Sequence, residues 1–316
     1  MCLIAIVGGG PCGLGAALRI LNTNPNAKVT IYEKRPDYTR TRLVLIDPAT
    51  MSKVLGVDGL PHRIRLCDLE ERLSKEVMAR GGLIFHRDIR SIEELPHDWF
   101  VIATGPKSDL RDRLLGPLLQ VREPKRVVTC TVMTPAPRIM NLFRFYKVLK
   151  VLESVAMEQA GPSSITLLWE PPTHFTEADI LKGLRFWVNL RDDPRTEPVH
   201  WHSYDSTLYV CQKFTDGQRV FGVGDAVVGI PYFQSLKNGI ANLDLIGSLD
   251  TFSVDRYARV LSARSAIRIG SMSSMSMTLD FASLYLTVSN RIPWQIIKQD
   301  KDQVEELSER AVDGLE

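Results

Sequence analysis

The feature that most constrains the fold of this chain is a glycine-rich turn directly after its first apolar run. Apolar residues 4–7 lead into Gly8, Gly10 and Gly13, and a second apolar run ends at Glu33. This order is the βαβ plan of a dinucleotide site: a strand, a Gly-x-Gly-x-x-Gly turn, a helix of small residues, and a second strand that ends in an acidic residue. The sequence therefore predicts a Rossmann-like unit at the start of the chain.

Each residue of this motif has a physical task. Gly8 permits the tight turn, Gly10 lets the backbone approach a pyrophosphate, and Gly13 lets the helix pack closely on the strand. The helix N-terminus favours a negatively charged group. Glu33 follows about twenty residues later, where a carboxylate can accept hydrogen bonds from a ribose diol.

Pro11 and Cys12 lie within the turn. The helix dipole could lower the pKa of Cys12 and make it a redox thiol. We favour the alternative, in which Cys12 is a small residue that fills space beside the turn.

Composition excludes some classes of protein. The 316 residues, 44% hydrophobic and 24% charged, suffice for one large domain or two modest ones. A net charge of +2 gives no reason to expect nucleic-acid binding. The five cysteines are scattered along the chain, which favours a cytoplasmic protein with reduced thiols. No run of about twenty apolar residues occurs, so we expect no transmembrane segment.

The middle of the chain changes character. Strand-like runs at 127–133, 165–169, 186–190 and 208–214 alternate with helical patterns at 138–159 and 176–184. We predict an α/β fold with a Rossmann-like βαβ sheet, an inserted mixed, mainly antiparallel sheet and C-terminal helices. The predicted divisions are a discontinuous nucleotide domain at 1–111 and 216–250, an insertion at 112–215, helices at 251–297 and an acidic, frayed tail at 298–316.

In two later segments, an apolar run that we expect to be a strand is also followed by a glycine. Residues 100–103 lead into Gly105, and a second run leads into Gly224 and Asp225. Ligands of open α/β sheets bind beyond the carboxyl ends of the strands, where these residues are expected.

Together with the first motif, these segments resemble one family, the FAD-dependent monooxygenases of the p-hydroxybenzoate-hydroxylase type, also called class A flavoprotein hydroxylases. The resemblance rests on the glycine turn with Glu33 and the basic loop to Arg42, on residues 98–111, and on residues 224–238. It covers roughly two-thirds of the chain in the family's order, and the insertion matches only in position.

The resemblance implies an FAD site. The glycines of the turn would bind the pyrophosphate, and Glu33 would bind the adenosine ribose. Arg42 would approach FAD from its loop, and Asp225 would bind the ribityl region. Pro231 and Asn238 would lie beside the isoalloxazine. The implied cofactor-binding residues are Gly8, Gly10, Pro11, Cys12, Gly13, Glu33, Lys34, Arg35, Arg42, Gly105, Gly224, Asp225, Pro231 and Asn238.

The chain departs from the family pattern in two places. Thr104 stands where the family has an aspartate before glycine, and 234–237 replaces the usual glycines before Asn238. Before the resemblance is considered, a surface role for Arg42 is as plausible as a functional one.

No catalytic residue is assigned from the sequence. His200, His202 and Tyr204 alternate in a strand-like run and would share one face. His-x-His can bind a metal, but without a third ligand we favour a plain sheet surface and predict no metal site.

The resemblance implies a monooxygenase that uses FAD, NAD(P)H and O₂ to oxygenate a small, aromatic or polycyclic substrate. Two alternatives stay open: a flavin oxidase, reductase or halogenase of the same fold, and a redox-silent flavin-binding interaction module. The substrate, the choice between NADH and NADPH, and the oligomeric state are not set by the sequence.

Overall fold

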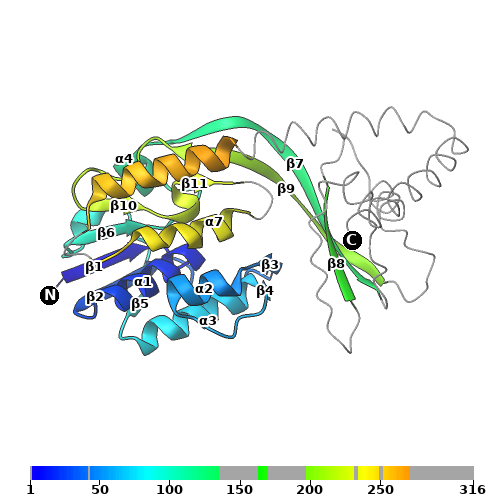
Figure 1. Ribbon diagram of the computed structural model, residues 1–316, viewed down its shortest axis with the longest axis horizontal. Coiled ribbons are helices and arrows are strands. Elements are labelled where there is room, and N and C mark those ends of the chain that lie inside the picture. Colours follow the sequence, from blue (N-terminus) through cyan, green and yellow to red (C-terminus); the bar gives the residue numbers. More distant parts are fainter. Residues whose placement is uncertain are drawn as a thin grey trace, which may run out of the picture.

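The computed structural model describes residues 2–41, 43–134, 163–169, 197–230, 234–248 and 252–270. The centre of the fold is a parallel sheet of five strands in the order β10-β6-β1-β2-β5 (Figure 1). Its strands are β1 (Cys2–Val7), β2 (Ala27–Glu33), β5 (Leu83–His86), β6 (Trp99–Ile102) and β10 (Val220–Gly222).

The first βαβ unit is confirmed. Helix α1 (Pro11–Thr23) connects β1 to β2, and Glu33 is the last residue of β2. Strands covered on both faces are expected to be continuously apolar. Accordingly, Ile4 and Ile6 of β1 are fully buried, and so is Val101 of β6.

Helices cover this sheet. Helix α1 contacts α2 (Pro48–Leu55), α3 (Leu66–Ala79) and α7 (Gln234–Asn242), whereas α4 (Asp109–Leu115) contacts β10. A further helix spans 254–270, and Tyr257 on it donates a 2.6 Å hydrogen bond to the Gly222 carbonyl oxygen of β10. The short helices are η1 (Ile92–Glu94), η2 (Gly224–Ala226) and η3 (Leu243–Leu245).

Local signals place several of these helices. Helix α2 begins after Asp47, whose carboxylate accepts a 3.2 Å hydrogen bond from the Ala49 amide. The helix ends at Gly56, whose left-handed backbone has a φ of 64°. Helix α7 ends at Asn242, and η3 follows it directly.

A second, antiparallel sheet has the order β11-β9-β7-β8. Its strands are β7 (Leu118–Thr134), β8 (Ser163–Trp169), β9 (Glu197–Cys211) and β11 (Val228–Gly229). The predicted antiparallel sheet is therefore confirmed, and β7 and β9 run as a long ribbon away from the parallel sheet (Figure 1).

The strand bounds differ from the prediction. Strand β9 lies mainly before the apolar run at 208–214, and β7 begins at Leu118 rather than at residue 127. Each extension pairs mainly with the predicted apolar run of the other strand: the start of β7 pairs with residues 208–211, and the start of β9 pairs with residues 127–133. Strands β3 (Leu43–Leu45) and β4 (Arg63–Arg65) form a small antiparallel pair, and β4 carries too few apolar residues to be predicted.

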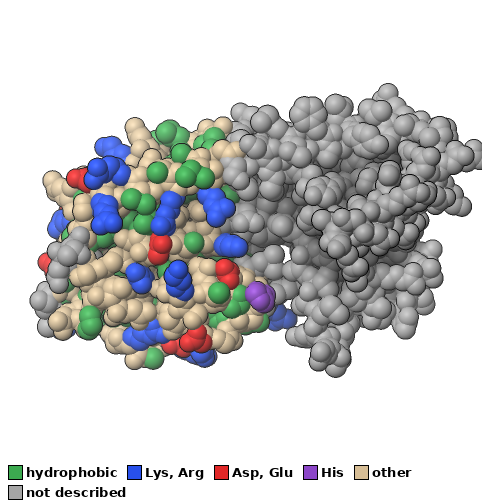
Figure 2. All heavy atoms as spheres, in the orientation of Figure 1, with side chains coloured by type: hydrophobic (Ala, Val, Ile, Leu, Met, Phe, Trp, Pro, Cys, Tyr) green, Lys and Arg blue, Asp and Glu red, His purple; other side chains and the backbone are tan. Residues whose placement is uncertain are grey.

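Several predicted elements fall outside the described residues: the helices at 138–159 and 176–184, the strand at 186–190, the chain beyond 270 and the acidic tail. Within the described part of the chain, no helix combines the length and the hydropathy needed to cross a membrane. Figure 2 shows positive and negative side chains interspersed on the visible face of the parallel-sheet part.

Candidate dinucleotide-binding site

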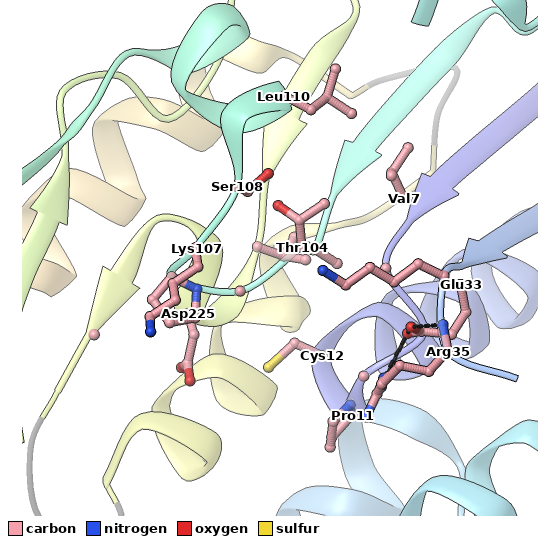
Figure 3. Close-up of a pocket in the computed structure, with 18 of the residues that line it drawn as sticks. Val7, Pro11, Cys12, Glu33, Arg35, Thr104, Lys107, Ser108, Leu110 and Asp225 are labelled. Carbon is pink, nitrogen blue, oxygen red and sulfur yellow. Dashed lines mark hydrogen bonds and ion pairs between the residues drawn. The ribbon is translucent and has the colours of Figure 1, made fainter. Parts of the chain in front are cut away.

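A cavity of about 1050 Å³ lies at the carboxyl ends of the parallel strands (Figure 3). Val7 of β1, Glu33 of β2 and the residues after β6 all line it. Strands β2 and β5 lie on one side of β1 in the sheet, whereas β6 and β10 lie on its other side. The cavity therefore lies at the point where strand order reverses, the position at which open α/β sheets bind ligands.

The three motif glycines have different surroundings. Gly8 has a φ of 109°, and a Cβ there would overlap the Ala103 carbonyl oxygen. A Cβ on Gly13 would overlap the Gly8 carbonyl oxygen. At Gly10 the nearest atom to a Cβ would be Arg40 Nη2, 3.6 Å away. Packing thus requires glycine at two positions, whereas Gly10 is open toward the cavity.

Glu33 is fixed beside the glycine turn. Its carboxylate accepts hydrogen bonds from the Gly9 amide at 2.7 Å and from Arg35 Nε at 3.0 Å. Burial alone would raise the pKa of Glu33, but the bonds from Arg35 and Gly9 outweigh it and hold the pKa below its ordinary value. Glu33 is therefore an anion at neutral pH, at the edge of the cavity.

A second buried carboxylate was missed by the sequence analysis. Glu70 of α3 is fully buried and forms ion pairs with Arg40 and, at 3.3 Å, with Arg35. Because a buried charge requires partners, Glu70 holds both guanidinium groups beside the turn. A signal was present, since Glu70 interrupts the apolar face of α3 next to Leu69 and Leu73.

The segment after β6 forms another wall of the cavity. Gly105, with a φ of 76°, lines the cavity, and the Ser108 hydroxyl caps α4 by accepting a 3.1 Å hydrogen bond from the Arg111 amide. The Arg111 guanidinium is buried and donates to the carbonyl oxygens of Gly105, Pro106 and Ala226. This arginine fastens the loop after β6 to the Gly224–Asp225 segment.

Cys12 fills space, as we favoured. A Cβ on Gly224 would lie 2.5 Å from its Sγ, and one on Gly239 would lie 2.6 Å away. Burial, with a contribution from Asp225, raises the pKa of the Cys12 thiol. The alternative of a thiol with a lowered pKa is therefore wrong.

Asp225 joins the cavity to the antiparallel sheet. Its carboxylate accepts a hydrogen bond from the Ser235 hydroxyl of α7, and its carbonyl oxygen accepts one from the Tyr209 hydroxyl at 3.1 Å. Burial, and then Asp225, raises the pKa of Tyr209. Tyr209 and Ser235 both line the cavity, and neither was singled out from the sequence as a ligand-binding residue.

Most predicted site residues meet in this cavity. Those that line it are Gly8, Gly10, Pro11, Cys12, Glu33, Lys34, Arg35, Gly105 and Asp225. Gly13 packs behind the turn, and Gly224 and Asn238 line a much smaller pocket nearby. Arg42 and Pro231 lie outside the described residues, and so do the side chains of His200, His202 and Tyr204. The backbones of these three take alternate positions on β9, opposite Thr131, Thr129 and Val127.

The sequence matches no family model and no curated protein. Solved structures, however, share its fold. The Diels-Alderase PyrE3 of pyrroindomycin biosynthesis is 16% identical, with a TM-score of 0.63 over 92% of this chain and 77% of PyrE3. The p-nitrophenol 4-monooxygenase PnpA from Pseudomonas putida DLL-E4 is 15% identical, with a TM-score of 0.56 over 94% of this chain and 98% of PnpA.

A third similar structure is the flavin-dependent monooxygenase PieE in complex with FAD and substrate. It is 17% identical, with a TM-score of 0.56 over 87% of this chain and 64% of PieE. At these identities the comparison concerns the fold. The chain has the fold of the class A flavoprotein hydroxylases, as the resemblance in its sequence implied.

Proposed function

We propose that this protein is an FAD-dependent monooxygenase that uses NAD(P)H to transfer one atom of O₂ to a small aromatic or polycyclic substrate. The observation that carries the proposal is the cavity at the reversal of strand order. It collects the glycine turn, Glu33, Gly105 and Asp225 around one space of about 1050 Å³. Typical small-molecule sites occupy about 300–1,000 Å³, so the cavity is large enough for an extended ligand.

The residues present are suited to a dinucleotide. Gly10 leaves the N-terminus of α1 open, so that backbone amides there can meet a diphosphate. Arg40, held by Glu70, adds a positive charge beside them. Glu33 would accept hydrogen bonds from the adenosine ribose, and Asp225 from the ribityl chain.

When bound, FAD supplies the redox chemistry, and the protein supplies position, electrostatics and exclusion of water. The neighbours add support on substrate class, since PnpA is named for a nitrophenol. A cytoplasmic location is part of the proposal, because Cys12, Cys67 and Cys211 are free thiols among the residues that the structure describes.

The test begins with the absorption spectrum of the purified protein. We expect a yellow protein, or a colourless one that becomes yellow when FAD is added, and faster NADH or NADPH oxidation when phenolic or polyketide-like compounds are supplied. With ¹⁸O₂, the label should appear in the product. A protein that cannot be loaded with FAD would refute the proposal.

One observation favours a second candidate, a flavin-binding protein whose reaction involves no net oxidation. PyrE3, which has this fold, is named for a Diels-Alder reaction. The departures at Thr104 and at 234–237 are compatible with this role. FAD that binds tightly but is not reduced by NADH or NADPH, with any of the compounds present, would favour this second candidate.

A further inference from the structure

Asp225 is held at its backbone and at its side chain by two different hydroxyl groups. The Tyr209 hydroxyl donates a 3.1 Å hydrogen bond to its carbonyl oxygen, and the Ser235 hydroxyl donates one to its carboxylate. These two residues belong to β9 and α7, so two elements fix a residue of a third, η2. Figure 3 shows Asp225 beside Cys12 in the wall of the cavity. Asp225 is half-buried there, so a ligand in the cavity can reach it.

The hydroxyl of Ser235 has a defined direction. Its oxygen accepts a 3.3 Å hydrogen bond from the Ile230 amide, and its proton is donated to Asp225 Oδ1. An ionised carboxylate only accepts hydrogen bonds, so the chemistry of the pair sets the direction of the second bond. Hydrogen bonds in such a chain polarise one another. The backbone after β11 therefore directs the serine, and the serine directs the carboxylate.

The torsion that this hydrogen bond controls is otherwise loose. The outer torsion of an aspartate side chain has a broad, roughly two-fold distribution, so the rotamer does not set the plane of the carboxylate. The hydrogen bond at Oδ1 sets that plane. Binding sites need their polar groups within about 0.5 Å of the productive position, and groups that are fixed before binding save the cost of ordering them. Ser235 thus gives Asp225 an orientation that the carboxylate alone would lack.

Ser235 lies in the stretch 234–237, which replaces glycines of the family pattern. Glycine has no side chain and offers only its backbone to its surroundings. In this chain the same stretch begins α7 and supplies a hydroxyl that contacts Asp225. The departure from the family pattern therefore adds a contact that holds a residue of the cavity wall.

We propose that Ser235 is a positioning residue for the cofactor, whose hydroxyl orients the Asp225 carboxylate toward the ribityl hydroxyls of FAD. This inference rests on the proposed function for FAD as the ligand and for the contact between Asp225 and the ribityl chain. Ser235 acts through Asp225 and does not need to touch the cofactor itself.

The test measures the FAD affinity of the full chain by isothermal titration calorimetry. The proteins compared are wild type, Ser235→Ala, Ser235→Thr, Asp225→Ala and the double variant Ser235→Ala/Asp225→Ala. Ser235→Ala should weaken FAD binding by about three- to tenfold, the range of one net hydrogen bond. Ser235→Thr keeps the hydroxyl and should stay close to wild type. Asp225→Ala should weaken binding more than Ser235→Ala, because it removes the group that contacts FAD.

The double variant distinguishes a positioning serine from a merely structural one. If Ser235 acts through Asp225, its loss has no further effect on binding once the carboxylate is gone. The double variant should therefore bind FAD as weakly as Asp225→Ala alone. Additive losses would overturn the inference, since the hydroxyl would then act on the ligand or on the fold independently of Asp225.

Ser253→Ala is the matched control. Ser253 also lies at the start of a helix, the one at 254–270, where its hydroxyl accepts a 3.2 Å hydrogen bond from the Arg256 amide. It is not among the residues that line the cavity. Its replacement should lower the melting temperature, as the loss of a helix cap does, and leave the FAD affinity unchanged. Equal losses of FAD affinity in Ser253→Ala and Ser235→Ala would assign both to stability and overturn the inference.

The remaining outcomes separate this inference from the proposed function. Wild-type protein that binds FAD, with equal affinity in Ser235→Ala, overturns the inference and leaves the proposed function intact. A Ser235→Thr variant as weak as Ser235→Ala also overturns it, because the hydroxyl would not be the group that acts. Wild-type protein that cannot be loaded with FAD overturns both proposals.

Discussion

At the scale of single residues, the glycines of one motif perform separable tasks. Gly8 and Gly13 are required by the packing of the turn against itself and against the end of β6. Gly10 meets no such restriction and instead leaves the N-terminus of α1 accessible. Folding and ligand binding are thus assigned to different residues, which makes them separable by mutation.

Gly13→Ala should destabilise the protein by about 1–3 kcal/mol, because the new methyl group would overlap the Gly8 carbonyl oxygen. Gly10→Ala should keep the stability of the wild type and lose FAD affinity, because the methyl group would stand where the diphosphate approaches. Urea unfolding and FAD titration measure the two effects. Equal loss of stability in both variants would contradict this division.

Glu33 should contribute a pH-dependent part of the stability. Its folded-state pKa lies below the ordinary value of 4.5, so its contribution is complete above that value and is lost as the pH falls through the folded-state pKa. We expect Glu33→Gln to cost about 1–3 kcal/mol at neutral pH. The difference from wild type in unfolding free energy should stay constant from pH 7 to about pH 5 and shrink below it. A difference that grows on acidification would show the opposite sign of the pKa shift.

At the scale of elements, α4 is short but links two walls of the cavity. Ser108 begins the helix, and Arg111 connects the loop after β6 to the carbonyl oxygen of Ala226 in η2. The helix buries Leu110 and Leu115 in the core and places the Arg111 guanidinium between the two walls.

Arg111→Met should therefore destabilise the protein by about 2–3 kcal/mol, since three carbonyl oxygens lose a charged donor. Chemical denaturation would measure this loss. Arg259→Met, at an exposed position of the helix at 254–270, is the control and should change stability by less than about 0.5 kcal/mol. An Arg111 variant as stable as the control would show that the carbonyl oxygens find other donors.

At the scale of the whole molecule, the two sheets meet at Asp225. Tyr209 of β9 crosses Gly229 of β11 and donates to the Asp225 carbonyl oxygen. Strand β11 itself pairs with β9, although it lies between β10 and α7 in the chain. The proposed division into a nucleotide domain and an insertion stays a prediction.

A ligand that contacts the ends of β1, β2 and β6 together with η2 should stabilise the folded chain as a unit. At a free FAD concentration of about 100 times Kd, mass action adds about 2.7 kcal/mol to the unfolding free energy. Differential scanning calorimetry should show a melting temperature that rises with FAD concentration. Riboflavin, which lacks the diphosphate and adenosine, should give a smaller rise, and an equal rise would argue against binding through the glycine turn.

The sequence by itself determined the features that depend on neighbours along the chain. The βαβ unit and the glycines that follow β1, β6 and β10 can be read from hydrophobic period and φ restrictions, which act over a few residues. For the same reason the motif glycines, Glu33, Gly105 and Asp225 could be proposed as site residues in advance.

Only the tertiary structure decided contacts between residues far apart in sequence. It paired Arg40 with Glu70, brought Tyr209 to Asp225, extended β9 through a polar stretch, and left Thr104 Oγ1 buried without a partner. The physical reason is that burial and pairing are properties of the packed chain. A carboxylate acquires its cation, and a hydroxyl loses its solvent, only when distant elements close around them.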